Sequence, residues 1–211
     1  MSAELRELPM FPLESVPFPG SVLPLHVFEP RYRAMVRHCL AHDRAFGVVL
    51  IARGSEVGGG DDRLSVGTLA RIEEASELPD GRFVLVAAVA ARVAVDTWLP
   101  DDPYPRAMVG PRRSTGGLPP ATLDGALRAV RRAVALLTEL GAPGPGLADP
   151  DPGAGPEELL WRLCDAAPLG TLDRQRLLEA DDLGQRADAL TRLATDAGDD
   201  LVALLSERRA P

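Results

Sequence analysis

The spacing of apolar residues changes near residue 110, and this change divides the chain into two parts. Before it, short apolar runs such as 8–13, 22–28 and 46–52 are bracketed by Pro and Gly. Pro and Gly at such places mark the turns that join strands. After it, Leu and Val recur three and four residues apart, which is the period of one helical face. The sequence therefore predicts an α+β protein, with a strand-rich first half and a helical second half.

The first half is expected to hold one early helix among its strands. Apolar residues of the segment after Pro30 follow the spacing i, i+3, i+4, i+7, i+8, and Pro suits a first helical turn. Further strands are expected at 65–72, 82–98 and 104–111, with a turn whose tip is Asp80 and Gly81. The segment 82–98 is long enough to bend across a barrel. We therefore expect residues 1–112 to form a mostly β unit.

The second half, residues 118–211, is expected to form a helical bundle. A first helix from about residue 123 should stop at Gly141, and a connector rich in Pro and Gly follows at 142–156. Three more helices are expected, opened by Pro156, by Thr171 as N-cap, and by Asp182 with Gln185 as its capping-box partner. The last helix should run to the C-terminus with a weak point at Gly198.

The charge of the chain argues against two classes of partner. The formal net charge is -8, all 23 basic residues are Arg, and Lys is absent. Binding to nucleic acid or to an anionic membrane requires a dense positive patch, which an acidic chain with scattered Arg does not provide. No apolar run approaches the roughly 18 residues of a membrane span, and the first residues lack the basic and apolar regions of a signal peptide, so none is expected. A cytoplasmic protein is expected, with Cys39 and Cys164 as small buried thiols.

Several motifs of the first half occur together in one known family. The segment LPMFPLESVPFPGSVLPLHVFEPRYRAMV, residues 8–36, resembles the opening of the N-terminal substrate-binding domain of Lon proteases. In that family, a Leu-Pro-x-x-Pro-Leu strand, a Phe-Pro-Gly turn and a Leu-Pro-Leu strand lead into the first helix. The form Glu-Pro-Arg-Tyr at 29–32 looks like the version found in stand-alone Lon-domain proteins. SVGT at 65–68 and LPDG at 78–81 match a further strand and turn of the family.

The resemblance continues in the helical half and implies a fold and a function. The segment DAAPLGTLDRQRLLEADDLGQRADALTRL resembles the family's Leu-Pro-Leu, Lys-Gln, Leu-Leu-Glu and Arg-x-x-x-Leu succession, with Arg186 and Leu190 in the last of these places. The family resemblance implies a PUA-like β-barrel with an attached helical bundle, used to engage substrate polypeptides. Lon's own chemistry is not expected here, because the sequence has no Gly-x-x-x-x-Gly-Lys phosphate loop and no Lys for a Ser-Lys dyad.

Other possible chemical sites are better explained as solvated surface. His38 and His42 share a helical face as two metal ligands can, but no further cluster of ligands accompanies them. The GGGDD run at 58–62 lacks the alternating spacing of a calcium loop. Solvated surface is also expected for the acidic residues Asp61, Asp62, Glu73, Glu74, Asp149 and Asp151. The sequence contains no Gly-x-Ser-x-Gly motif, which would mark a nucleophilic serine. We expect no catalytic residues, no metal and no cofactor.

The early aromatic residues are the candidates for binding. Engagement of unfolded polypeptide needs exposed apolar surface with a polar rim. Phe11 and Phe28 on apolar strands are expected to be structural, whereas Phe18, between two prolines in a turn, and Tyr32 are better candidates than these two for exposed contacts. The predicted substrate-binding residues are Phe18, Phe28, Glu29, Arg31, Tyr32 and Arg33.

The leading hypothesis is a non-catalytic module that binds unfolded or degron-bearing polypeptides and acts as an adaptor in proteolysis. A protease or a chaperone is then a further candidate partner, and no nucleic acid or membrane is expected. The alternative is a domain that binds a small metabolite in the mouth of the barrel, which would need a ligand-sized cavity. RNA binding, by analogy with PUA barrels, is a third hypothesis, and the negative net charge of the chain disfavours it.

Overall fold

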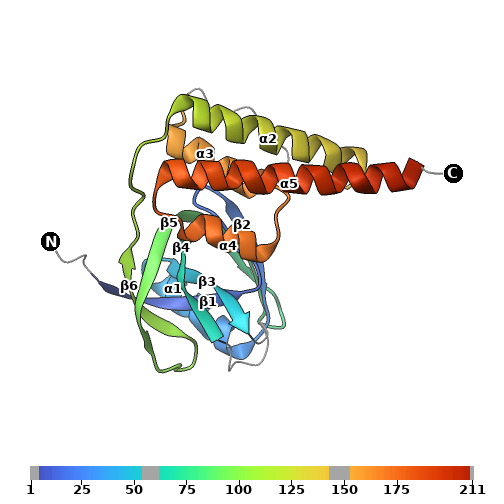
Figure 1. The fold of residues 1–211 in the computed structure, drawn as a ribbon. Helices are drawn as coiled ribbons and strands as arrows, with labels where there is room; N and C mark the ends of the chain where they lie inside the picture. The colour runs from blue at the N-terminus through green and yellow to red at the C-terminus, as the bar shows by residue number, and fades with distance from the viewer. Residues whose placement is uncertain (1–4, 54–61, 143–152, 210–211) are drawn as a thin grey trace. The chain divides into compact units, whose positions relative to one another are not determined.

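The computed structural model describes residues 5–53, 62–142 and 153–209, which form two compact units, 1–113 and 114–211 (Figure 1). The first unit holds a mixed sheet and one helix, and the second holds four helices, so the protein is α+β as predicted. Most of the GGGDD run at 58–62 and of the connector at 142–156 lies outside the described residues. None of the helices in the described ranges has both the length and the apolar character needed to cross a membrane.

The first unit is built on six strands and the early helix. They are β1 (Arg6–Leu13), β2 (Val22–Val27), α1 (Pro30–Ala41), β3 (Ala45–Arg53), β4 (Asp62–Glu77), β5 (Phe83–Leu99) and β6 (Arg106–Pro111). β1 and β3 pair in parallel, connected through β2 and α1, and the other pairs are antiparallel. β6 pairs with both β1 and β5, so the pairings of β5, β4, β3, β1 and β6 form a closed cycle. β2 pairs with β5 alone.

Apolar residues on both faces of the strands are buried. Phe11 and Leu13 of β1 belong to a large cluster that includes the inner face of α1, whereas Leu8 and Met10 belong to a second cluster with β6. Successive side chains of a strand point to opposite faces, so one strand can serve both clusters. Gly47 of β3 lies opposite Met10, and a Cβ added there would be 2.4 Å from the Met10 Sδ. The absence of a side chain at residue 47 therefore leaves room for Met10.

The local signals for α1 and for the following hairpin are confirmed. α1 begins at Pro30, and the face that it buries carries Tyr32, Met35, Val36 and Cys39. At the hairpin tip, the Gly81 N–H donates to the Leu78 carbonyl at 2.8 Å. Gly81 has φ +78°, a conformation that residues with a side chain rarely adopt. Proline and glycine thus fix the positions of this helix start and this turn.

The second unit consists of α2 (Pro120–Glu139), α3 (Pro156–Ala166), α4 (Thr171–Glu179) and α5 (Leu183–Arg209). Gly141 follows α2 in a left-handed conformation, as its predicted stop. The Asp182 Oδ1 accepts a hydrogen bond from the Gln185 N–H at 2.9 Å, which confirms the predicted N-terminal cap of α5. The prediction for α4 is wrong: Gly170 is the N-cap residue, and Thr171 is already helical.

The last helix is not interrupted at its glycine. α5 continues through Gly198, contrary to the predicted weak point. α2 and α5 pack against each other as the two long helices of this unit (Figure 1). A Cβ added at Gly198 would lie 3.0 Å from the Arg132 Nη1 and 3.7 Å from the Leu136 Cδ1, both on α2. The lost helix propensity of glycine, about 1 kcal/mol, is therefore offset by close packing of the two helices.

Candidate functional site

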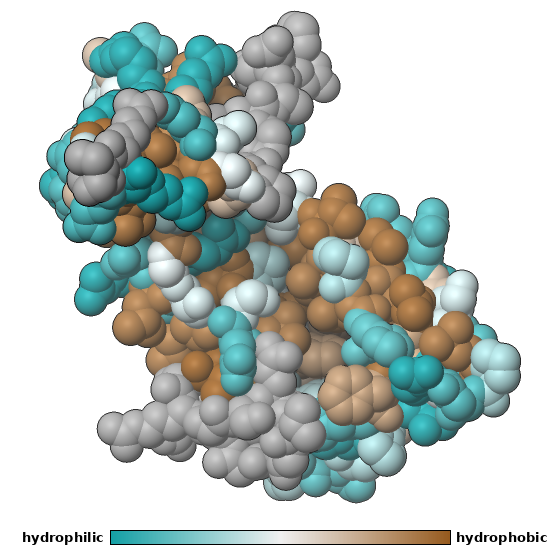
Figure 2. Space-filling model, turned by 90° about the vertical axis from the view of Figure 1, so that its right-hand side faces the viewer, coloured by the Kyte–Doolittle hydropathy of each residue, from teal (hydrophilic) through white to brown (hydrophobic). Residues whose placement is uncertain are grey.

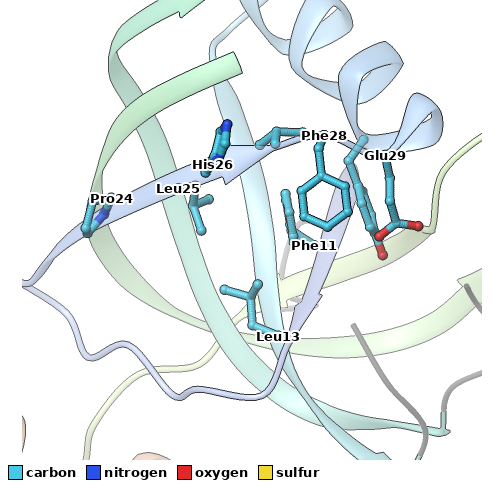
Figure 3. A pocket seen from close by; sticks show the side chains of 9 residues that line it. Phe11, Leu13, Pro24, Leu25, His26, Phe28 and Glu29 are labelled. Carbon is cyan, nitrogen blue, oxygen red and sulfur yellow. The ribbon is translucent and has the colours of Figure 1, made fainter. Parts of the chain in front are cut away.

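The first unit contains a pocket of about 180 Å³ beside β2. Phe11 and Leu13 of β1 line it on one side, and β2 with the residues that follow it lines the other (Figure 3). Most of the residues that line it are apolar and several belong to the large core cluster, although polar atoms form a comparable share of the exposed wall. The lining residues are Phe11, Leu13, Pro24, Leu25, His26, Val27, Phe28, Glu29 and Tyr32.

Phe28 is exposed because it lies in the junction between a strand and a helix. β2 ends at Val27, which is buried, and α1 begins at Pro30. Phe28 retains 51% of its surface exposed, although it is one of the largest apolar side chains of the protein. Figure 2 shows one face of the molecule, on which hydrophobic residues reach the surface in patches bordered by polar ones. An exposed aromatic ring beside an apolar pocket is typical of a site that binds apolar groups.

A stack of aromatic and charged groups forms the polar side of the pocket. The rings of Phe11 and Tyr32 are stacked, with 4.3 Å between centroids and 11° between planes. The Arg31 guanidinium carbon lies 4.5 Å from the centroid of the Tyr32 ring, and the Arg31 Nε donates to the Glu29 Oε2 at 3.1 Å. Glu29 and Arg31 are both partly buried. This ion pair is therefore held in place at the edge of an apolar surface.

The predicted ranking of the early aromatic residues as candidates for exposed contacts is wrong. Phe18 is 0% exposed, so the turn between its two prolines directs the ring inward. Tyr32 is 2% exposed, because it lies on the face of α1 that packs against the strands. Phe28, expected to be structural, is instead the exposed residue. The local sequence placed Phe18 in a turn, Phe28 at the end of a strand and Tyr32 in a helix, but it did not show which of these side chains other segments would cover.

The six predicted substrate-binding residues divide between the pocket and its surroundings. Phe28, Glu29 and Tyr32 line the pocket, and Arg31 contacts two of them. Phe18 and Arg33 do not line it; the Arg33 guanidinium lies at the turn of Gly81, where an added Cβ would be 2.0 Å from its Nη2. Sequence reasoning missed Leu13 and the β2 residues. The signal that could have found β2 is its alternation, in which Val22, Pro24 and His26 are the exposed positions.

The structure gives no support to a metal site in the described ranges. The imidazole rings of His38 and His42 are stacked at 4.3 Å, and the His42 Nδ1 lies 2.8 Å from the His38 carbonyl oxygen. Within residues 5–53, 62–142 and 153–209, no three His, Cys, Asp or Glu side chains come together as metal ligands would. Asp61, Asp149 and Asp151, with most of the GGGDD run, lie outside the described residues. Glu73 and Glu74 are both exposed, next to a register shift of β4 against β5.

Both cysteines are free and buried, as expected. The Cys39 Sγ donates to the Ala45 carbonyl at 3.4 Å. Burial raises the pKa of the Cys39 thiol to about 12, and Asp43 adds to this effect. Burial likewise raises the pKa of the Cys164 thiol to about 12, against the opposing effect of Arg186. A thiol that stays protonated is a poor nucleophile, so neither residue has the character of a catalytic cysteine.

Six arginines of the first unit form ion pairs with carboxylates. Arg31 pairs with Glu29, and Arg37 pairs with Glu77. The same is true of four more pairs: Arg6 with Asp43, Arg63 with Asp101, Arg82 with Asp80, and Arg106 with Glu7. Such pairs leave little net positive charge for phosphate groups. At these six positions, the positive charge is balanced by a neighbouring carboxylate.

Comparison with known proteins gives matches over most of the chain. The model of the family described as "ATP-dependent protease La (LON) substrate-binding domain" matches residues 7–196. Lon protease 2 of Sorangium cellulosum is 30% identical over 193 residues, which cover 88% of this chain and 24% of that protein. Lon protease 2 of Myxococcus xanthus is 36% identical over 104 residues, which cover 48% of this chain and 13% of that protein. The chain thus spans about a quarter or less of these relatives.

Two solved structures have a similar fold. The Lon N-terminal domain protein from Xanthomonas campestris is 29% identical, with a TM-score of 0.59, over 88% of this chain and 96% of that one. The N-terminal domain of the Lon protease from the Mycobacterium avium complex has a TM-score of 0.61 over 90% of this chain and 99% of that one. Its sequence identity is 16%, so this second likeness concerns the fold alone.

Proposed function

Because this chain belongs to the Lon substrate-binding domain family, we propose that the pocket beside Phe28 binds apolar side chains of substrate polypeptides. The observation that carries the proposal is the half-exposed Phe28 ring at a pocket lined by core residues. A folded protein hides its apolar side chains, so an apolar pocket favours unfolded chains over folded ones. The Glu29 and Arg31 ion pair provides the polar rim.

The volume of the pocket favours a side chain over a metabolite. Pockets for small molecules typically measure about 300–1,000 Å³. The pocket of about 180 Å³ is smaller, and its only charged lining residue is Glu29, which is already paired with Arg31. A metabolite site would also need several converging polar groups. The alternative of a metabolite bound in the mouth of a barrel therefore has less support.

The wider role that we propose is that of a non-catalytic adaptor. Such a protein would hold unfolded or degron-bearing polypeptides in the cytoplasm and pass them to a protease or a chaperone. These 211 residues contain no phosphate loop and no Lys, so the ATP hydrolysis and the Ser-Lys chemistry of Lon would not come from them. The closed cycle of strand pairings supports a PUA-like barrel as the scaffold.

An equilibrium titration tests the proposal. A fluorescently labelled model protein would be added in a permanently unfolded form and, as a control, in its folded form. We expect saturable binding of the unfolded form alone, competed by short peptides that carry a central Leu or Phe. Absence of binding to the unfolded form, or equal binding of the folded form, would refute the proposed function.

A further inference from the structure

β2 has an edge that no described strand occupies. It is the terminal strand in the order β2-β5-β4-β3-β1-β6, and it pairs with β5 from Val22 to Val27. The other edge of β2 has no paired strand among residues 5–53, 62–142 and 153–209. Edge strands offer backbone N–H and C=O groups to a further strand.

The register of β2 shows which of its residues face that edge. The Val89 N–H donates to the Ser21 carbonyl at 3.0 Å, so residue 21 directs its carbonyl toward β5. In an antiparallel pair, residues that exchange hydrogen bonds with the neighbour alternate with residues that turn away from it. Val22, Pro24 and His26 are therefore the residues whose backbone groups face away from β5. Pro24 has no N–H, so at this position it costs β2 no hydrogen bond to β5.

The pocket adjoins the same strand. The consecutive residues 24–29 all line it, and Phe11 and Leu13 of β1 line it from the opposite side (Figure 3). In an extended peptide, every second side chain points to the same face. A peptide strand along β2 would therefore bring alternate side chains to the pocket, whose volume of about 180 Å³ suits one large side chain.

We propose that a substrate polypeptide binds as an added strand on the free edge of β2, with one apolar side chain in the pocket. The N–H groups of Val22 and His26 donate to the peptide, and the carbonyls of Val22, Pro24 and His26 accept from it. Backbone pairing of this kind is independent of side-chain identity, and the pocket selects for an apolar residue. The inference rests on the proposed function, because it specifies how the same site holds its polypeptide.

A scan of backbone methylation separates strand addition from binding through side chains alone. The probe is a short unstructured peptide with one central Leu among Ser and Thr. Its affinity is compared with the affinities of a series of variants of the same peptide, each N-methylated at a different backbone amide. We expect binding to weaken about fivefold or more wherever the methyl group replaces an N–H that faces β2. The amides of the alternate residues, which face solvent, should tolerate methylation with little change in affinity.

Amide hydrogen exchange by NMR gives a second readout on the protein. Saturating peptide should slow exchange at the amides of Val22 and His26 by about fivefold or more, while the Leu25 amide, which faces β5, is the matched control. Peptide binding with no alternation in the methylation scan and no added protection at these amides would overturn strand addition and leave the proposed function standing. If neither the unmodified peptide nor an unfolded protein binds, both the strand addition and the proposed function are overturned.

Discussion

The guanidinium carbon of Arg186 lies 3.8 Å from the centroid of the Trp161 ring, inside the helical unit. Arg186 is 0% exposed. Its Nε donates to the Leu177 carbonyl at 3.2 Å, and its Nη2 donates to the Ala180 carbonyl and to the Ser114 Oγ. A buried cation is tolerated only where several acceptors and an aromatic face replace water. This one side chain therefore ties α5 to α3, to the end of α4 and to the segment before α2.

We predict that Arg186→Met destabilises the helical unit by at least about 2 kcal/mol, because it leaves buried carbonyl groups without donors. Denaturant unfolding monitored by far-UV circular dichroism measures the change. Arg192→Met, at an exposed position of the same helix, is the matched control and should stay within about 0.5 kcal/mol of the parent protein. Equal stability of the two variants would contradict the role assigned to Arg186.

Substitution of Gly67 should destabilise the sheet. Gly67 pairs with Val49, and an added Cβ would lie 2.0 Å from the Val48 carbonyl oxygen and 2.7 Å from the Val49 Cγ1. The first of these atoms belongs to the backbone, so β3 and β4 would have to separate. We predict that Gly67→Ala lowers the free energy of unfolding by about 1–3 kcal/mol. Gly117→Ala, where no atom lies within 4 Å of the added Cβ, is the control in the same denaturation experiment.

The buried thiols should make stability fall at high pH. Burial raises the pKa of Cys39 and of Cys164 to about 12, whereas an unfolded thiol titrates near pH 8.5. The folded state therefore keeps protons that the unfolded state releases. The contribution of the thiols to stability is complete below about pH 8.5 and decreases as the pH rises toward 12.

Urea unfolding across this range measures the effect. The Cys39→Ala, Cys164→Ala double variant is the control, and its stability should fall less steeply with pH than that of the parent. Parallel pH dependences in the two proteins would show that the thiols do not contribute. Burial, and to a lesser extent Cys39, raises the pKa of Tyr104, so the Cys164→Ala single variant, which leaves Cys39 beside Tyr104, is the comparison in which the effect of Tyr104 cancels.

Truncation of the exposed ring should weaken binding without affecting the fold. We predict that Phe28→Ala reduces affinity for unfolded polypeptide about tenfold or more, because an aromatic anchor at a binding site commonly contributes 1 to 2 kcal/mol or above. Thermal stability should change little, because the side chain is half exposed. Leu172→Ala, at a residue 68% exposed in the helical unit, is the control for loss of surface hydrophobicity. Equal affinities of the two variants would argue that the pocket is not the binding site.

The prolines and glycines let the sequence predict the elements well. Pro30 and Pro156 open the helices where expected, because proline fixes φ and needs no N–H partner in a first turn. Gly81 and Gly141 mark the turn and the helix end where the backbone enters the left-handed region. The change of apolar period near residue 110 likewise identified the α+β class. These features are local, so a single sequence contains them.

The sequence by itself thus determined the elements, the acidic charge and the absence of Lys, and through its motifs the family. Only the tertiary structure decided that Phe18 and Tyr32 are buried and Phe28 exposed, and that Phe11 and Leu13 meet β2 around a pocket. The exposure of a side chain depends on which segment packs over it, and β1 and β2 are brought to the pocket by pairing with different strands. Those pairings join residues far apart in the chain, which local periodicity does not encode.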